Sequence, residues 1–209
     1  MTHKEFEEML ISRQTLPVYE KLKNARIGIA GLGGLGSNIA MMLARAGVGS
    51  LVLADFDTVE ISNLNRQHYF IRHLGMKKSM ALEEQLKEVN SWISLKTYDI
   101  RITGKNAAEI FKDCPIICEA FDNPVSKAEL TSAVLSDLPN TYVVAGSGMA
   151  GHSSANNIRT THPMRRLYVC GDGVTEIGND VSLIAPRVQL CAAHQANAAI
   201  RLCLGLTDI

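Results

Sequence analysis

A glycine-rich turn between an apolar strand and a helix constrains the fold of this chain more than any other feature. The turn, GLGGLG, runs from Gly31 to Gly36 after the strand-like RIGIA, and a helical segment and a second apolar strand follow it. Asp55 ends that second strand, 24 residues beyond Gly31. This order of strand, G-x-G-x-x-G turn, helix, strand and acid is typical of a nucleotide site in a doubly wound α/β sheet.

Each glycine of the turn has a predicted task. Gly31 allows the chain to leave the strand sharply, Gly33 lets a phosphate approach backbone N–H groups, and Gly36 lets the helix pack closely on the sheet. Gly34 opens the helix, whose N-terminus attracts an anion through its free N–H groups and its dipole. Asp55 lies where a carboxylate can accept hydrogen bonds from a ribose. These residues leave open whether the nucleotide is NAD, FAD or ATP.

Strand-like and helix-like segments alternate along the rest of the chain. Such alternation favours an α/β fold with a doubly wound, mainly parallel Rossmann-like sheet. Residues 148–183 break the pattern, and we expect an antiparallel extension and a mobile crossover or lid there. With a helical arm over 1–24, interrupted near Pro17, the whole chain of 1–209 is predicted to be a single domain. Strands are predicted at 27–29, 50–54, 93–98, 115–119 and 141–145, and helices at 34–46, 76–90, 104–112, 125–137 and 184–204.

Composition and charge argue against several classes of function. The chain has 209 residues, no net charge and a pI near 7.0, so its electrostatics indicate no nucleic-acid or membrane partner. The N-terminus is polar and no apolar run is long enough to span a bilayer, so we expect a cytoplasmic protein.

The five cysteines do not form a metal-binding pattern. They stand at positions 114, 118, 170, 191 and 203, without a C-x-x-C pair. Cys114 and Cys118 flank the strand-like CPIIC, so we expect them to point to the same face and to be core thiols rather than metal ligands. The sequence therefore predicts no zinc site.

A polar segment over residues 57–75 interrupts the expected crossover directly after the ribose acid. Ligands bind outside the carboxyl ends of parallel strands, so this segment is predicted to lie over the nucleotide. Arg66 can hold phosphates with its guanidinium, and Asn63 and Asn65 can hydrogen-bond a ribose or a phosphate. Two lysines, the second of them Lys78, open the next helix against its dipole, which favours an anion nearby. A solvated basic loop is the alternative interpretation.

Asp122 and Asn123 follow the fourth predicted strand at the same edge of the sheet. A carboxylate there can hold Mg²⁺, which binds through one or two carboxylates and the phosphates of a substrate. The same pair can equally cap the helix that begins near Pro124. Arginine, lysine and a metal-binding acid around phosphates suit nucleotidyl or phosphoryl transfer better than hydride transfer.

Together these motifs resemble those of the ThiF/MoeB/HesA family, which is related to the ubiquitin-activating enzymes. The resemblance rests on GLGGLGS, DFDTV, SNLNRQ, the G-x-x-K of Gly75 to Lys78 and FDN at 121–123, which agree in order and spacing over most of the chain. It implies an adenylyltransferase that binds ATP and Mg²⁺, adenylates the C-terminal Gly-Gly carboxylate of a ubiquitin-fold sulfur carrier and releases pyrophosphate. The size and C-terminal pattern are most similar to the short ThiF proteins of thiamine (thiazole) biosynthesis, whose carrier is ThiS.

The resemblance also implies roles for individual residues. Asp55 would bind the ribose, Asp122 would hold Mg²⁺, and Arg13 would reach the γ-phosphate in the partner subunit of a homodimer. The implied catalytic set is Arg13, Arg66, Lys78 and Asp122. The implied cofactor-binding set is Gly31, Gly33, Gly34, Gly36, Asp55, Asp57, Asn63, Asn65, Arg66, Gln67 and Lys78.

The chain departs from the family pattern in its cysteines, and other functions stay open. The two C-x-x-C pairs of many members are absent. Cys170, in YVCGDG, lies only loosely where some members carry a reactive thiol, and a structural strand cysteine is the alternative. An enzyme of the same superfamily that acts on another carrier or on a tRNA would share these motifs. An NAD-binding oxidoreductase would share the glycine turn and Asp55.

Overall fold

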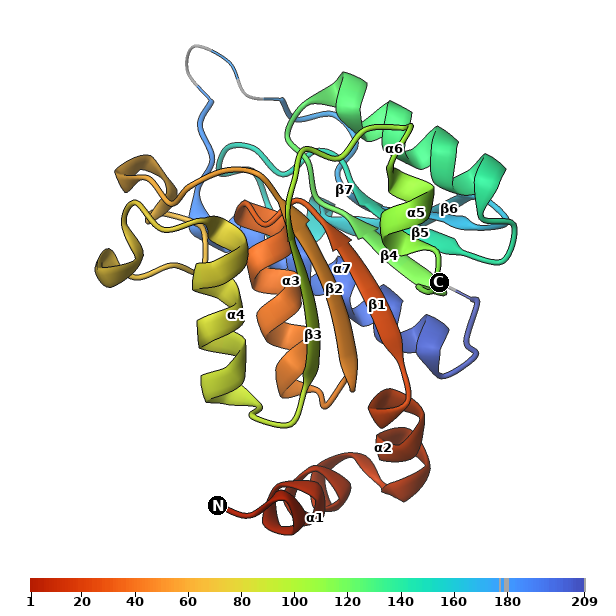
Figure 1. The fold of residues 1–209 in the computed structure, drawn as a ribbon. Coiled ribbons are helices and arrows are strands. Elements are labelled where there is room, and N and C mark those ends of the chain that lie inside the picture. Colours follow the sequence, from red (N-terminus) through yellow and green to blue (C-terminus); the bar gives the residue numbers. More distant parts are fainter. Residues whose placement is uncertain (177, 179–180, 209) are drawn as a thin grey trace.

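A seven-stranded sheet forms the centre of the protein (Figure 1). The structure is a computed structural model that describes residues 1–176, 178 and 181–208. The strands are β1 (Arg26–Ala30), β2 (Ser50–Asp55), β3 (Ser94–Asp99), β4 (Ile116–Glu119), β5 (Tyr142–Gly146), β6 (Arg159–Met164) and β7 (Leu167–Gly171). Their order in the sheet is β3-β2-β1-β4-β5-β7-β6, and only β6 runs antiparallel to its neighbour. The predicted α/β fold, with a mainly parallel sheet and an antiparallel extension, is confirmed.

Helices cover both faces of the sheet. They are α1 (His3–Gln14), α2 (Leu16–Lys23), α3 (Gly34–Arg45), α4 (Lys78–Val89), α5 (Ala107–Phe111), α6 (Pro124–Asp137) and α7 (Ala185–Cys203). The helices α3, α4 and α7 pack on one face over the larger apolar cluster, and α5 and α6 pack on the other (Figure 1). Because both faces are covered, the central strands are buried along almost their whole length, which explains their continuous apolar runs. Among the described residues, no helix combines the length and apolar character needed to cross a membrane.

The strand order reverses between β1 and β4. The chain passes from β1 outward to β2 and β3, then returns to β4 and β5 on the other side. The carboxyl ends of β1 and β4 therefore meet at the topological switch point, where open α/β sheets bind their ligands. The glycine turn follows β1 and the FDN motif follows β4, so the fold brings both motifs to one crevice.

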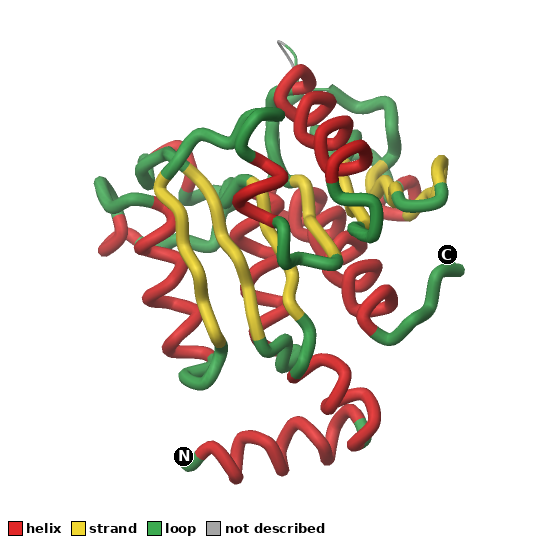
Figure 2. The backbone as a smooth tube through the Cα atoms, turned by 45° about the vertical axis from the view of Figure 1, so that its right-hand side comes forward, coloured by secondary structure: helices red, strands yellow, loops and turns green. Residues whose placement is uncertain are grey.

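The N-terminal arm, α1 and α2, lies at the opposite end of the sheet from this crevice (Figure 2). The predicted interruption of the arm is present at Thr15, whose φ of 79° is not helical. Gln14 donates a hydrogen bond to the carbonyl of Ala46, beyond the end of α3, at 2.9 Å. The rings of Phe6 and Trp92 pack with their centroids 5.1 Å apart. These contacts hold the arm against the amino-terminal side of the sheet.

The polar insert, residues 57–76, connects β2 to α4. Two single-turn 3-10 helices, Ile61–Asn63 and Ile71–His73, form its regular structure. Two backbone hydrogen bonds join the ends of the insert. The N–H of Gly75 donates to the carbonyl of Val59 at 2.9 Å, and the N–H of Val59 donates to the carbonyl of Met76 at 2.8 Å. The hydroxyl of Ser37 in α3 accepts a further hydrogen bond from the backbone of the insert at 3.0 Å. The insert is therefore fixed on the first helix after the glycine turn.

The region of 148–183, predicted as an extension and a lid, contains β6, β7 and the 3-10 helix Ala155–Asn157. Residues 177, 179 and 180 of the predicted lid lie outside the described residues. Leu183 closes the segment and, as shown below, contacts the polar insert. The chain then enters α7, whose first turn contains Pro186 as predicted.

One expectation about the cysteines is wrong. Cys114 and Cys118 are both buried thiols, as predicted, but they belong to the apolar clusters on opposite faces of the sheet. Cys114 precedes Pro115 and lies outside β4, so the alternation of side chains along the strand does not extend to it. Burial raises the pKa of the Cys114 thiol to about 12.

Candidate nucleotide-binding site

The glycine turn has the geometry that its sequence predicts. Gly31 has a φ of +89°, which residues with a side chain rarely adopt. A Cβ at Gly36 would lie 1.8 Å from the carbonyl oxygen of Gly31, so a residue with a side chain would push α3 away from the turn. Gly33 is the N-cap of α3, and a Cβ there would meet only the side chain of Gln67, at 3.8 Å. Space is therefore open in front of the free N–H groups that begin α3.

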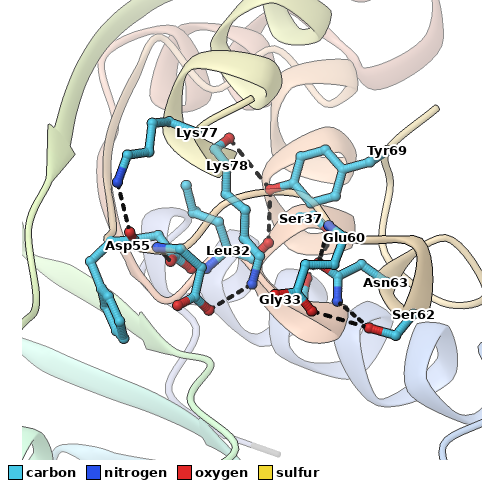
Figure 3. Close-up of polar contacts among 12 residues, drawn as sticks. Leu32, Gly33, Ser37, Asp55, Glu60, Ser62, Asn63, Tyr69, Lys77 and Lys78 are labelled. Carbon is cyan, nitrogen blue, oxygen red and sulfur yellow. Dashed lines mark hydrogen bonds and ion pairs between the residues drawn. The ribbon is translucent and has the colours of Figure 1, made fainter. Parts of the chain in front are cut away.

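Asp55 connects the tip of β2 to the glycine turn. Its carboxylate accepts hydrogen bonds from the backbone N–H of Leu32 at 2.6 Å and of Asp57 at 2.8 Å (Figure 3). Asp55 is only 8% exposed, so these charge-assisted bonds hold the turn firmly. Asp57, two residues further on, lines the pocket in front of α3.

Lys78 brings a buried positive charge to the same pocket. Its Nζ lies 2.8 Å from Oδ2 of Asp57, and its side chain is 7% exposed, against 46% for that of Asp57. Tyr69 supports this arrangement, because its hydroxyl donates to the carbonyl of Leu32 at 2.9 Å (Figure 3). Burial raises the pKa of Tyr69 well above its usual value, so the hydroxyl stays protonated at neutral pH. A phosphate in the pocket would thus contact the ammonium group of Lys78, which Asp57 holds in place.

The SNLNRQ motif forms another wall of the pocket. Nη1 of Arg66 donates to the carbonyl of Ser62 and to Oδ1 of Asn65, each at 2.9 Å. Asn65 in turn donates to the carbonyl of Leu183 at 3.1 Å, which joins the insert to the segment before α7. Arg66 and Gln67 both line the pocket. Asn65 therefore orients the arginine rather than lining the pocket itself.

Two polar atoms of this wall have no partner within the part of the chain that the structure describes. Nε of Arg66 and Oε1 of Gln67 are buried without a hydrogen bond. Buried polar groups are normally paired. Nε of Arg66 is a donor that suits a phosphate oxygen, whereas Oε1 of Gln67 is an acceptor that suits a hydroxyl or an amino group. The free N–H groups of α3 and the ammonium of Lys78 add donors suited to phosphate oxygens. The residues present therefore fit a phosphate-bearing nucleotide such as ATP.

Asp122 reaches the pocket from the end of β4. Its side chain is exposed and lines the pocket together with Ala120 and Phe121. Asn123 is the residue that caps α6, because its Oδ1 accepts a hydrogen bond from the N–H of Ser126 at 3.0 Å. The capping alternative therefore applies to Asn123 and leaves the carboxylate of Asp122 available to a ligand.

The acids of the pocket fit Mg²⁺ only together with a nucleotide. Within the described ranges, no three or more His, Cys, Asp or Glu residues are grouped to hold a metal ion by themselves. Mg²⁺ needs few protein ligands, however, when phosphates and water complete its coordination. Asp122 and Asp57 both line the pocket and could supply such ligands.

Gly31, Gly36 and Asp55 shape the turn without lining this pocket, and Asn63, Arg13 and Cys170 also lie outside it. Asn63 lies in an adjoining cavity that also contains Asp57 and Lys78. Arg13 is exposed on α1, at the opposite end of the sheet (Figure 1). Cys170 is fully buried in β7, and burial raises its pKa to about 11, which disfavours the reactive thiolate at neutral pH.

Sequence reasoning did not single out several buried polar contacts beside the site. Glu119, at the end of β4, has no exposed surface and pairs with Lys127 at 2.8 Å. Asp172 and Arg187 pair at 2.6 Å, and each side chain is 6% exposed. Nε2 of Gln195 donates to the carbonyl of Glu119 at the end of β4 and to that of Val144 in the middle of β5, both at 2.9 Å. The available signals were the charged residue that ends the otherwise apolar IICE and the glutamine within the apolar last helix.

Fold and pocket together define a class of protein: a Rossmann-like α/β domain with a pocket suited to a phosphate at the switch point of its sheet. Within that class, the chain belongs to the ThiF family, whose model matches residues 7–209. The resemblance inferred from the motifs is thereby confirmed.

Curated relatives match most of this chain. It is 34% identical over 192 residues to the adenylyltransferase and sulfurtransferase UBA4 of Eremothecium gossypii, covering 90% of this chain and 40% of that protein. It is 33% identical over 198 residues to the adenylyltransferase and sulfurtransferase MOCS3 of Dictyostelium discoideum, covering 87% of this chain and 43% of that protein. The chain thus spans about two fifths of the length of these relatives.

Solved structures share the fold. The E. coli tRNA N6-threonylcarbamoyladenosine dehydratase TcdA, in complex with ATP, has a TM-score of 0.85 and 19% sequence identity, covering 95% of this chain and 93% of that chain. E. coli MccB with AMPCPP and MccA has a TM-score of 0.68 and 23% identity, covering 90% and 58%. At these identities the likeness is one of fold.

Proposed function

We propose that the protein uses ATP to adenylate the C-terminal Gly-Gly carboxylate of a small ubiquitin-fold sulfur carrier and releases pyrophosphate. The observation that carries the proposal is that Arg66, Lys78 and Asp122 converge on one pocket in front of α3. Membership of the ThiF family supports it, and both curated relatives named above are adenylyltransferases. Hydride transfer would not need these three charged groups.

The chemistry follows from the charges in the pocket. A carboxylate oxygen of the carrier attacks the α-phosphorus, and the bond from that phosphorus to the bridging oxygen of pyrophosphate breaks. Both reactants are anionic, so Arg66, Lys78 and the N-terminus of α3 reduce their repulsion and stabilise the charge that develops. Bound Mg²⁺, held by Asp122, would add charge neutralisation and orient the phosphates. The nucleophile is already ionised at neutral pH, so no general base is required.

A groove next to the pocket offers a route for the tail of the carrier. It shares four residues with the nucleotide pocket and continues along the ends of β5 and β7. The shared residues are Phe121, Asp122, Met149 and Leu183. An extended C-terminus in this groove would place its carboxylate beside Asp122 and the α-phosphate. This geometry suits a flexible protein tail better than a folded substrate.

The partner we propose is a ThiS-like carrier, and the process is the formation of the thiamine thiazole. The similarity of the motifs to those of the short ThiF proteins supports this choice. The curated relatives are also sulfurtransferases by name, so a different sulfur carrier is the main alternative. We further propose a cytoplasmic homodimer in which Arg13 completes the site of the partner subunit.

Exchange of radiolabelled pyrophosphate into ATP tests the proposal. We expect exchange that requires Mg²⁺ and a ThiS-like carrier ending in Gly-Gly, and that stops when the two glycines are removed. Unchanged exchange with the truncated carrier would contradict carrier adenylation. If exchange requires a carrier of another pathway, or tRNA, the adenylation chemistry stands but the proposed substrate is wrong.

A further inference from the structure

We propose that the buried pair Glu119–Lys127 is a positioning device for Asp122, which aims that carboxylate at the Mg²⁺–nucleotide. Neither residue would touch the ligand; both would act through the short link between β4 and α6. The inference rests on the proposed function only in its assumption that Asp122 serves a metal-bound nucleotide.

The pair closes a ring around the residue before Asp122. Oε1 of Glu119 accepts a hydrogen bond from the backbone N–H of Phe121 at 2.7 Å. Nζ of Lys127 lies 3.0 Å from Oε1 and 2.8 Å from Oε2 of Glu119, and it donates to the carbonyl of Phe121 at 2.9 Å. Both backbone groups of Phe121 are therefore held by the same ion pair.

Lys127 directs most of its hydrogen bonding to acceptors within the protein. An ammonium group has three N–H donors. Three oxygens, two from Glu119 and one from Phe121, already lie within 3.0 Å of Nζ. Two of the donors are engaged, by Oε1 of Glu119 and by the carbonyl of Phe121, whereas Oε2 of Glu119 is an ion-pair contact without a hydrogen bond, and Lys127 also borders the groove beside the pocket. The two hydrogen bonds make it a positioning residue.

Asp122 stands between two fixed points. On one side Phe121 is held by the ion pair, and on the other Asn123 caps α6 through its bond to Ser126. Gln195 anchors the strand end as well, because it donates to the carbonyl of Glu119 at 2.9 Å. The backbone of Asp122 is therefore restrained, while its side chain remains exposed to the pocket.

A buried ion pair is costly to form, and packed apolar residues would often serve stability as well. Glu119 is fully buried, whereas the side chain of Lys127 is 21% exposed. The pair holds the backbone of Phe121, the residue before the acid that enters the pocket from β4, which favours orientation as its role. A purely structural role is the alternative, and the two roles differ in what they do to metal-dependent binding.

The test replaces both members, Glu119→Gln with Lys127→Met, so that no unpaired charge stays buried. The affinity for a non-hydrolysable ATP analogue is measured by calorimetry in Mg²⁺ and in EDTA. We expect the gain in affinity from Mg²⁺ to fall about ten- to a hundredfold, as for other residues that orient metal ligands, and the affinity in EDTA to stay unchanged. Asp122→Ala should lose the same gain, and combining all three changes should lose no more.

The matched control is the exposed pair Glu109–Lys112 at the C-terminal end of α5. It is also a Glu–Lys pair, with Nζ of Lys112 2.9 Å from Oε1 of Glu109. The side chain of Glu109 is 79% exposed and that of Lys112 is 54% exposed, and neither residue lines the pocket. The same two substitutions there should leave the effect of Mg²⁺ unchanged. If the double variant at the site does not fold, Glu119→Gln alone should reduce the Mg²⁺ effect in the same direction.

Three results would overturn the positioning role. They are an unchanged Mg²⁺ effect in the folded variant, losses that add to that of Asp122→Ala, and a wild-type protein whose nucleotide affinity ignores Mg²⁺. Failure of the proposed function is recognised separately, because it is measured as absent pyrophosphate exchange in the wild-type protein. If nucleotide binding depends on Mg²⁺ but pyrophosphate exchange does not depend on the carrier, the positioning role stands and the proposed carrier is wrong.

Discussion

Two acids separated by one residue have different tasks at this site. Both carboxylate oxygens of Asp55 accept hydrogen bonds from backbone N–H groups, and Asp55 thereby holds the glycine turn. Asp57 is half exposed, lines the pocket and pairs with Lys78. A contact of Asp55 with ribose stays a prediction, and it would have to use the remaining lone pairs of an almost buried carboxylate.

Arg66 and Asp122 provide the sharpest test among single residues. We expect Arg66→Ala and Asp122→Ala each to reduce carrier-dependent pyrophosphate exchange by roughly a hundredfold or more, because each removes charge aimed at the reacting phosphates. Exchange rates are compared at equal amounts of folded protein, checked by circular dichroism. Arg72→Ala is the control, since Arg72 is an exposed arginine of the same insert that pairs with Glu84 outside the pocket. Equal losses in all three variants would contradict the assignment.

Among the elements, the start of α3 depends on close packing against the turn. A Cβ at Gly36 would collide with backbone, whereas one at Gly104 would have neighbours no closer than 3.7 Å. We expect Gly36→Ala to lower the free energy of unfolding by about 3 kcal/mol or more, and Gly104→Ala to change it by less than about 1 kcal/mol. Urea unfolding curves measure both. A Gly36→Ala protein of wild-type stability would show that the turn is looser than described.

The end of β7 is joined to α7 by the pair Asp172–Arg187. Nη2 of Arg187 lies 2.6 Å from Oδ2 of Asp172, and its Nη1 donates to the carbonyls of Ser153 and Ser154. Three segments that border the groove therefore depend on one buried ion pair. Breaking such a pair from one side leaves an uncompensated charge, which typically costs roughly 3–5 kcal/mol.

This pair predicts how stability depends on pH. Burial alone would raise the pKa of Asp172, but hydrogen bonds from Thr175 and Val174 outweigh it, so the pKa lies below its usual value. The unfolded chain then binds more protons in this range, so the contribution is complete above the usual pKa of about 3.9 and is lost as the pH falls through the lowered one. We expect Asp172→Asn to be less stable than the wild type at pH 7, and the difference to shrink below about pH 4.

Chemical unfolding at several pH values measures this difference. The control is Asp137→Asn, which changes an exposed acid at the end of α6. It should alter stability by no more than about 0.5 kcal/mol at any pH. A difference for Asp172→Asn that is constant from pH 7 to pH 3 would contradict the lowered pKa.

At the scale of the whole molecule, the arm and the pocket lie at opposite ends of the sheet (Figure 1). Arg13 is exposed on α1 and cannot meet the pocket of its own chain without leaving that end of the sheet. In a two-fold symmetric dimer, one subunit can present its arm to the pocket of the other. The proposed homodimer therefore requires the partner arrangement in which these two ends meet.

Mixing two inactive variants tests this arrangement. Arg13→Ala retains an intact pocket, and Asp122→Ala retains an intact arm. In a mixed dimer one of the two sites is complete, so random exchange of subunits should restore about a quarter of wild-type pyrophosphate exchange. Each variant alone should be inactive. No recovery after subunit exchange, shown by co-purification of differently tagged subunits to have produced mixed dimers, would contradict action in trans.

Most of the fold could be predicted because its signals are local. The apolar runs at β1, β2, β4 and β5 are short and separated by helical periodicity, which is sufficient for a doubly wound sheet. The pocket wall formed by Gly33, Gly34, Arg66, Gln67 and Lys78 followed from the same logic, since it lies at predicted strand ends. The antiparallel edge was also predicted, because residues 148–183 break the alternation.

The errors and omissions arose where side chains meet across the sheet. The face of Cys114 was wrong because a residue before Pro115 does not follow the strand alternation. Glu119 and Lys127 were passed over because a pair eight residues apart, across a strand end and a helix start, has no periodic signature. The separate tasks of Asp122 and Asn123 could not be distinguished until the cap bond was seen.

The sequence by itself determined the class of fold, the glycine turn and the chemistry of the pocket, because backbone conformation and charge are properties of short segments. Only the tertiary structure decided which groups are already paired and which face a ligand: Asp55 holds the turn, Asn123 caps α6, and Arg66, Lys78 and Asp122 line the pocket. The physical reason is that hydrogen bonding and burial depend on partners distant in the chain, and these partners meet only when the sheet is assembled.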